Sequence, residues 1–267
     1  MAAHLPDLAV PEWPRLEAYV AGPDGAPWVT FVPGIGNDAM FWERQASELS
    51  ATHRVLRFEP WGCGASEAPP ADLRIEGVAE GIVALWDALA IERSSVVGLG
   101  FGGSTALTLA LDHPDRVEKV VACCCRARQP DDRRDFWRDR QAIARRDGLE
   151  GLGEVTVERW LGDDFRAAHP EVEQRLTAGF RRSSVDGYVA YVGAFVAMDL
   201  TARLASLSTP TLLVAAEHDH GGGPVASMRQ LAAALPTAQL RVVAGSGHIV
   251  NHEAPDEVAA LLAAFLG

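Results

Sequence analysis

The sequence contains almost no lysine and few cysteines. Lys119 is the single lysine, whereas arginine supplies 23 of the 24 basic residues. The four cysteines are Cys63 and the consecutive Cys123, Cys124 and Cys125, which form neither a CxxC pair nor a spaced disulfide framework. We therefore expect free thiols, the state that a reducing cytoplasm maintains.

Long apolar runs and an excess of positive charge are also missing. Residues 94–111 form the longest uncharged stretch, but glycine and hydroxyl residues interrupt it, and a membrane helix needs ~20 apolar residues. The N-terminus lacks a basic start followed by an apolar core, so we expect no secretory leader and a cytoplasmic location. The net charge of −12 disfavours nucleic acid. A small-molecule substrate is the expected partner.

Short apolar runs alternate with helical patterns along the 267 residues, which is typical of βαβ units on a parallel sheet. The predicted strands are Leu16–Ala21, Trp28–Val32, Arg54–Phe58, Ser95–Leu99, Val117–Cys123, Thr211–Ala215 and Gln239–Val243. The clearest helices between them are Phe41–Leu49, Ile75–Leu89, Ser104–Leu111, Val225–Leu235 and Pro255–Leu266. The pattern predicts an α/β fold, with a mostly parallel sheet and helices on both faces.

Residues 126–203 break this alternation, because only helical patterns occur there: Phe136–Arg146, Val155–Leu161, Pro170–Ser183 and Val185–Ala197. We expect an α/β core domain of residues 1–125 and 204–267, with 126–203 inserted as a helical cap. Thirteen of the 23 arginines lie in 126–182, interleaved with acidic residues. This favours solvated helix faces with i,i+4 ion pairs. The alternative is that one or two arginines turn inward to bind an anionic substrate.

A glycine run, Gly98-Leu99-Gly100-Phe101-Gly102-Gly103, lies between a predicted strand and a helix. It fits the dinucleotide pattern G-x-G-x-x-G, but that site needs an acidic residue at the end of the following strand. Here the following strand ends in Ala122-Cys123-Cys124-Cys125. The other interpretation is a sharp strand-to-helix turn, G-x-Nu-x-G, whose central residue normally presents a nucleophile. Gly100 occupies that position, so the turn geometry is retained without a nucleophile.

Three further segments supply the remaining parts of such a site. Residues 31–37 form a glycine-bearing loop after a strand, suited to direct a backbone N–H at a developing oxyanion. Asp219 follows a later strand, and His248 follows the next one. The order along the chain is therefore turn, acid and histidine.

This set of segments resembles the α/β-hydrolase fold superfamily over almost the whole chain, and within it the 3-oxoadipate enol-lactonase branch. The segments that carry the likeness to this branch are Leu109 with His113-Pro114-Asp115-Arg116-Val117, Ala167-Ala168-His169-Pro170-Glu171-Val172, Pro210-Thr211-Leu212-Leu213-Val214, and Gly247-His248 with Glu253 and Pro255. The resemblance implies a catalytic acid at Asp219, a base at His248, and oxyanion-hole amides at Ile35 and Phe101. It implies no cofactor.

The sequence departs from the family pattern at Gly100 in place of Ser, at Pro33 where many relatives have His, and at Glu59 where many have Asp. Only the first departure removes chemistry. Cys63, the Cys123–Cys125 run and Ser104 are the candidate substitute nucleophiles, although buried cysteines are usually inert and Ser104 should face the helix packing.

Other assignments stay open at this point. Glu217, His218 and His220 surround Asp219 and present an alternative metal site, but no further ligand has motif spacing and we expect no metal. Trp137 and Trp160 are candidates for the substrate pocket or for the packing of the cap.

Without a nucleophile, a His–Asp pair beside an oxyanion hole is an acid–base site. We expect hydrolysis of an ester, a lactone or a C–C bond by activated water. The alternatives are a non-hydrolytic lyase, isomerase or cyclase, a binding protein on the same scaffold, or a variant engineered to lack its nucleophile.

Overall fold

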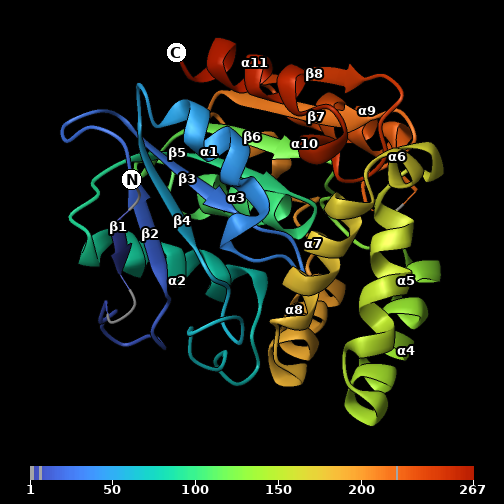
Figure 1. The fold of residues 1–267 in the computed structure, drawn as a ribbon. Helices are drawn as coiled ribbons and strands as arrows, with labels where there is room; N and C mark the ends of the chain where they lie inside the picture. The colour runs from blue at the N-terminus through green and yellow to red at the C-terminus, as the bar shows by residue number, and fades with distance from the viewer. Residues whose placement is uncertain (1–2, 6–7, 221) are drawn as a thin grey trace.

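The computed structural model describes residues 3–5, 8–220 and 222–267 (Figure 1). One sheet of eight strands has the order β1-β2-β4-β3-β5-β6-β7-β8. The strands are β1 (Ala3–Leu5), β2 (Ala18–Ala21), β3 (Trp28–Val32), β4 (Arg54–Phe58), β5 (Ser94–Leu99), β6 (Val117–Cys123), β7 (Thr211–Ala216) and β8 (Ala238–Val243). β1 and β2 are antiparallel to their neighbours, and the pairs from β4 to β8 are parallel. The predicted α/β fold is confirmed.

Helices cover both faces of this sheet (Figure 1). One face packs on α2 (Ile75–Ala88), α3 (Phe101–Asp112) and α9 (Val225–Ala234). The other packs on α1 (Glu43–Leu49), α10 (Val250–Glu253) and α11 (Pro255–Leu266). Every residue of β5 is buried, because this strand lies mid-sheet between two helical layers. The turn after β5 therefore starts from a rigid support.

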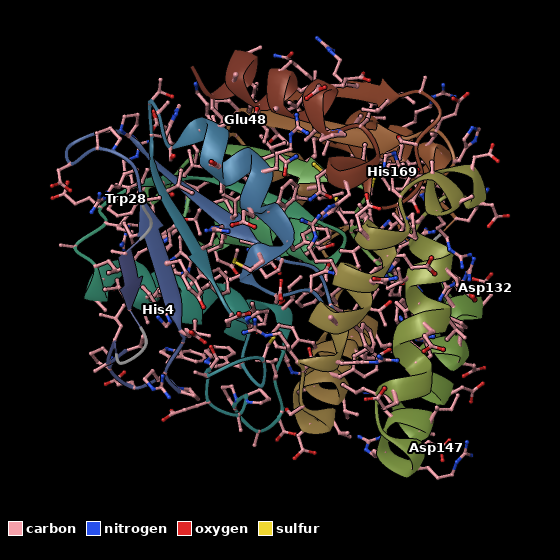
Figure 2. The ribbon with its side chains drawn as sticks, in the orientation of Figure 1. His4, Trp28, Glu48, Asp132, Asp147 and His169 are labelled. Carbon is pink, nitrogen blue, oxygen red and sulfur yellow. The ribbon has the colours of Figure 1, made fainter. Side chains whose placement is uncertain are left out.

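Residues 126–203, which we call the helical segment, are all described, and they form helices with two isolated bridges but no strand. The helices are α4 (Asp131–Asp147), α5 (Glu150–Trp160), α6 (Asp163–Ala168), α7 (Pro170–Arg181) and α8 (Val185–Ala197). Asp132 and Asp147 project from the outer side of α4 (Figure 2). The expected ion pairs occur at i,i+3 rather than i,i+4 spacing, as between Arg138 and Asp135 at 2.9 Å. None of the described helices has the length and apolarity to cross a bilayer.

Several predicted boundaries were wrong for identifiable reasons. β1 was missed, since three residues carry too little pattern to recognise. α4 begins at Asp131 rather than Phe136, because its first turn is acidic, which favours a helix start but adds nothing to an apolar stripe. α3 begins at Phe101 rather than Ser104. Gly102 and Gly103 have low helix propensity, so no helical pattern marks the first turn in the sequence.

Candidate active site

The turn between β5 and α3 retains the backbone of a nucleophile elbow. Gly100 has φ 59° and ψ −119°, a conformation that side-chain-bearing residues adopt only under strain. A Cβ on Gly98 would lie 2.2 Å from the carbonyl oxygen of Gly102, and one on Gly102 would lie 2.3 Å from that of Val32. The flanking glycines therefore allow the helix to start directly against the sheet.

Asp219 and His248 follow β7 and β8, which are adjacent parallel strands, so their carboxyl ends reach the same edge of the sheet. Nδ1 of His248 lies 3.0 Å from Oδ2 of Asp219. His248 is 8% exposed and Asp219 is 2% exposed. The two side chains therefore form a buried hydrogen-bonded pair.

Asp219 is held as a carboxylate by its surroundings. Burial alone raises its pKa, but the charge and hydrogen bond of His248 and the backbone N–H groups of Gly222 and Gly223 outweigh burial, and the pKa falls well below its usual range. Those N–H groups donate to the two carboxylate oxygens at 2.9 and 2.8 Å. An ionised carboxylate only accepts hydrogen bonds, so Nδ1 of His248 is the donor in this contact and Nε2 is the ring nitrogen left for the pocket.

The basic nitrogen of His248 faces the elbow. A Cβ on Gly100 would lie 3.4 Å from Nε2 and 3.6 Å from Cε1, which is ordinary van der Waals contact. A side chain at residue 100 would therefore project directly at the imidazole. With glycine there, the elbow places no side chain between Nε2 and the pocket.

Ile35 and Phe101, the residues expected to form the oxyanion hole, both line this pocket. Phe101 is the first residue of α3, so its backbone N–H is among the four at a helix start that have no acceptor within the helix. Ile35 lies in the loop after β3. The two amides belong to segments that meet at the pocket, and their catalytic role stays a prediction.

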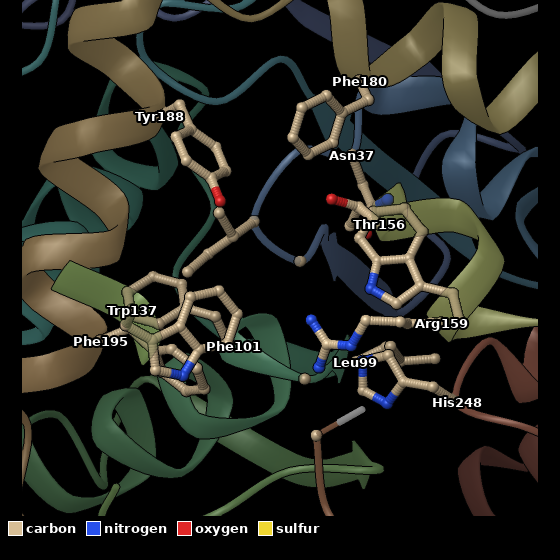
Figure 3. A pocket seen from close by; sticks show the side chains of 15 residues that line it. Asn37, Leu99, Phe101, Trp137, Thr156, Arg159, Phe180, Tyr188, Phe195 and His248 are labelled. Atoms are coloured by element: carbon tan, nitrogen blue, oxygen red, sulfur yellow. The ribbon is translucent and has the colours of Figure 1, made fainter. Parts of the chain in front are cut away.

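Aromatic side chains from the helical segment form one side of the pocket (Figure 3). Trp137 and Trp160, the two predicted lining residues, both contribute to it. Phe180, Tyr188 and Phe195 also line the pocket and were not predicted.

Arg159 is a pocket residue that sequence reasoning missed. Its guanidinium points into the pocket toward His248 (Figure 3) and lies 4.5 Å from the ring centroid of Phe136. Burial lowers its pKa, and so do the charges of Arg140 and Arg133. The charge of Asp219 raises this pKa in part, although the two side chains form no ion pair among the described residues. Arg159 shares the i, i+4, i+7 face of Leu152 and Thr156, but the sequence did not show that this face is the buried one.

The candidate substitute nucleophiles are buried and engaged elsewhere. Ser104 donates its hydroxyl to the carbonyl oxygen of Arg126 at 2.7 Å. Burial raises the pKa of Cys63, Cys123 and Cys124 far above the usual thiol range, and that of Cys125 to about 12. Thiolates are therefore disfavoured at all four cysteines.

The alternative metal cluster does not assemble as considered from the sequence. Glu217 and His218 have exposed side chains. Among the described residues, the group with metal-ligand geometry is instead Cys124, Asp219 and His248, whose ligand atoms lie within 4.8 Å of one another. Both carboxylate oxygens of Asp219 already accept hydrogen bonds, from Gly222, Gly223 and His248. These donors fit a hydrogen-bonded base better than a metal.

Glu59, which stands where many relatives have Asp, links the core to the helical segment. Its carboxylate is fully buried and accepts the backbone N–H of Ala39 at 2.9 Å and a guanidinium N–H of Arg182 at 2.6 Å. The longer side chain therefore has a structural partner at the end of α7.

The comparisons with known proteins agree with this architecture. A model of the α/β hydrolase fold family matches residues 27–255. The 3-oxoadipate enol-lactonase 2 of Acinetobacter baylyi is 26% identical over 255 residues, which cover 94% of this chain and 93% of that protein. The crystal structure of the enol-lactonase from Burkholderia xenovorans LB400 superposes with a TM-score of 0.90 at 31% identity, covering 94% and 96% of the two chains.

A hydrolase from Pseudomonas aeruginosa superposes over the whole chain and 98% of its own, with a TM-score of 0.92 at 25% identity. The chain belongs to the α/β hydrolase fold family. Its relatives include enol-lactonases, which confirms that part of the resemblance, and the chain is a hydrolase-like enzyme.

Proposed function

We propose that this enzyme hydrolyses an ester or lactone with a water molecule activated by His248, without an acyl-enzyme intermediate. One observation carries the proposal: Nε2 of a buried His248–Asp219 pair faces an elbow whose central residue is Gly100. The base is retained and the nucleophile is not. Nε2 of His248 is therefore placed to activate a water molecule as the nucleophile.

The reaction balances with this chain's own groups. Nε2 of His248 takes a proton from water while the water oxygen attacks the carbonyl carbon, and the N–H groups of Ile35 and Phe101 receive the oxyanion. Collapse breaks the bond to the leaving oxygen, which regains the proton from the imidazolium. An oxyanion hole and binding alone supply only about 10³–10⁴-fold catalysis. Hydrolysis by activated water therefore needs a reactive substrate, one whose leaving group is stable, such as an enolate. The enol-lactonase names of the relatives support that substrate class.

We also propose that the substrate carries a carboxylate that Arg159 binds. Arg159 points its guanidinium into the pocket and forms no ion pair there with a described carboxylate, so its hydrogen-bond donors can bind an anionic ligand. In this proposal residues 126–203 act as a cap domain over the core of residues 1–125 and 204–267. The cap then supplies both the aromatic wall and the anion-binding group.

Turnover in H₂¹⁸O, followed by mass spectrometry of product and protein, tests the proposed reaction. We expect one ¹⁸O atom in the product acid, and an unmodified protein mass throughout turnover of enol-ester and lactone substrates. A covalent acyl adduct on the protein would contradict the water mechanism.

The same experiment distinguishes a second candidate, a non-hydrolytic acid–base reaction such as an isomerisation or cyclisation. The aromatic side chains of Trp137, Phe180 and Phe195 favour this alternative, because an apolar wall offers a bound water molecule few hydrogen-bond partners. Product formed without any ¹⁸O would establish it in place of hydrolysis.

Replacing Arg159 by glutamine is expected to raise KM for a carboxylate-bearing substrate by about 30-fold, with a smaller effect on kcat. A hydrogen bond to a charged group contributes about 2 kcal/mol, which corresponds to that factor. Steady-state kinetics on paired substrates, one with a free carboxylate and one with its methyl ester, measure the difference.

Arg166→Gln is the matched control, because Arg166 lies in the same helical segment but pairs with Glu173 at 2.9 Å outside the pocket. We expect its kinetics to match the wild type. An equal loss for the neutral methyl ester in Arg159→Gln would show that the residue shapes the pocket without recognising an anion.

A further inference from the structure

The side chain of Arg126 joins three segments that meet behind the catalytic pair. Its Nε donates to the carbonyl oxygen of Gly222, and its Nη1 donates to Oγ of Ser227 on α9 at 2.9 Å. The backbone carbonyl oxygen of Arg126 accepts the hydroxyl proton of Ser104, one turn into the elbow helix. Arg126 is thus fixed at its backbone to α3 and at its guanidinium to the loop before α9.

Gly222, which accepts the hydrogen bond from Arg126, contacts both members of the pair. Its N–H donates to Oδ1 of Asp219 at 2.9 Å. A Cβ at Gly222 would lie 2.2 Å from Cε1 and 2.9 Å from Nδ1 of His248, so its backbone packs directly on the imidazole. The Gly222 carbonyl that Arg126 holds shares its peptide unit with the N–H of Gly223, which donates to Oδ2 of Asp219 at 2.8 Å. A shift of this peptide would therefore move a hydrogen bond of Asp219 and the support of the His248 ring together.

Gly222 and Gly223 carry no side chains that could fix the conformation of this loop. Glycine has the largest backbone freedom, so fixing these two residues costs more conformational entropy than fixing other residues. An arginine fork is a rigid, multiply donating group, so one side chain can fix the carbonyl of the loop and the hydroxyl of α9 at once. Its charge also attracts the carboxylate of Asp219.

We infer that Arg126 is a positioning residue for the catalytic base: it clamps the Gly222 peptide so that Asp219 stays hydrogen-bonded and the His248 ring stays aimed at the elbow. It touches neither the substrate nor the reacting atoms. The inference rests on the proposed role of His248, and nothing in the sequence marks Arg126, which is one of 13 arginines in 126–182.

Arg126→Gln tests this inference with two readouts. The first is the downfield proton resonance of the His248 Nδ1–H···Asp219 hydrogen bond, which needs no substrate. We expect this resonance to broaden or vanish in the variant while circular dichroism shows a native fold. The second is kinetic: kcat should fall about 10-fold or more with KM within about twofold of wild type, a loss similar to that seen when a residue that orients a metal-bound histidine is replaced.

Ser227→Ala is the matched control, because it removes the other partner of the guanidinium and leaves the bond to Gly222 in place. We expect its resonance and kcat to match the wild type. Arg126→Ala with added guanidinium ion should regain both signals in part, which a purely structural role would not predict. Arg126→Lys serves if the glutamine variant does not fold, and it should show the same loss in weaker form.

The possible outcomes separate the two proposals. A folded Arg126→Gln protein with an unchanged resonance and unchanged kcat overturns the clamp. A lost resonance with unchanged kcat supports the clamp and instead contradicts the proposed role of His248 as the base.

Discussion

Gly100→Ser is expected to give the enzyme a covalent esterase activity, with a burst of about one product per active site on a chromogenic ester. The backbone determines where the new side chain projects, and a Cβ there lies 3.4 Å from Nε2 of His248. A hydroxyl one bond further is within hydrogen-bond reach of the base. Stopped-flow absorbance measures the burst, and intact mass spectrometry detects the acyl adduct.

Gly100→Ala is the matched control for this variant, because it adds the Cβ without the hydroxyl. Both substitutions place a non-glycine residue at φ 59°, so both should lower the free energy of unfolding by about 1 kcal/mol or more, measured by thermal melting. Only the serine variant should show the burst, and adding His248→Ala should abolish it. A well-folded serine variant without esterase activity would show that the pocket serves another reaction.

His248→Ala is expected to reduce kcat by about 10²–10⁴-fold, the usual contribution of a general base. Nδ1 is held by a carboxylate, so the reactive nitrogen is aimed at the elbow, and no other described imidazole lines the pocket. Initial rates on an enol-ester or lactone measure the loss, and imidazole added to the variant should restore part of it.

His218→Ala is the control for this second substitution. His218 precedes Asp219, but its side chain is 61% exposed, so its removal should leave kcat unchanged. Full turnover by His248→Ala would show that another group is the base, and it would contradict the proposed mechanism in which His248 activates water.

Local patterns were sufficient for the framework of the site. Apolar runs followed by small residues located the strands, and the carboxyl ends of parallel strands share one edge of the sheet. Asp219 and His248 could therefore be paired from their positions after two successive strands. The glycines around residue 100 predicted the sharp turn, because only glycine permits so close an approach of helix and sheet.

The contents of the pocket depended on packing between distant segments, which no local pattern records. Arg159 looks like its exposed neighbours in the sequence, yet the orientation of α5 turns it toward His248. Arg126 contacts Gly222 across 96 positions of sequence.

The sequence by itself thus determined the α/β fold, the elbow with glycine at its centre, and the acid and histidine after successive strands. Those features follow from periodicity and backbone sterics, which act over a few residues. Only the tertiary structure decided which arginine enters the pocket, which peptide supports the imidazole, and that the base faces an elbow without a side chain. Such contacts arise from the docking of segments far apart in the chain, where burial and hydrogen-bond satisfaction select among many equivalent side chains.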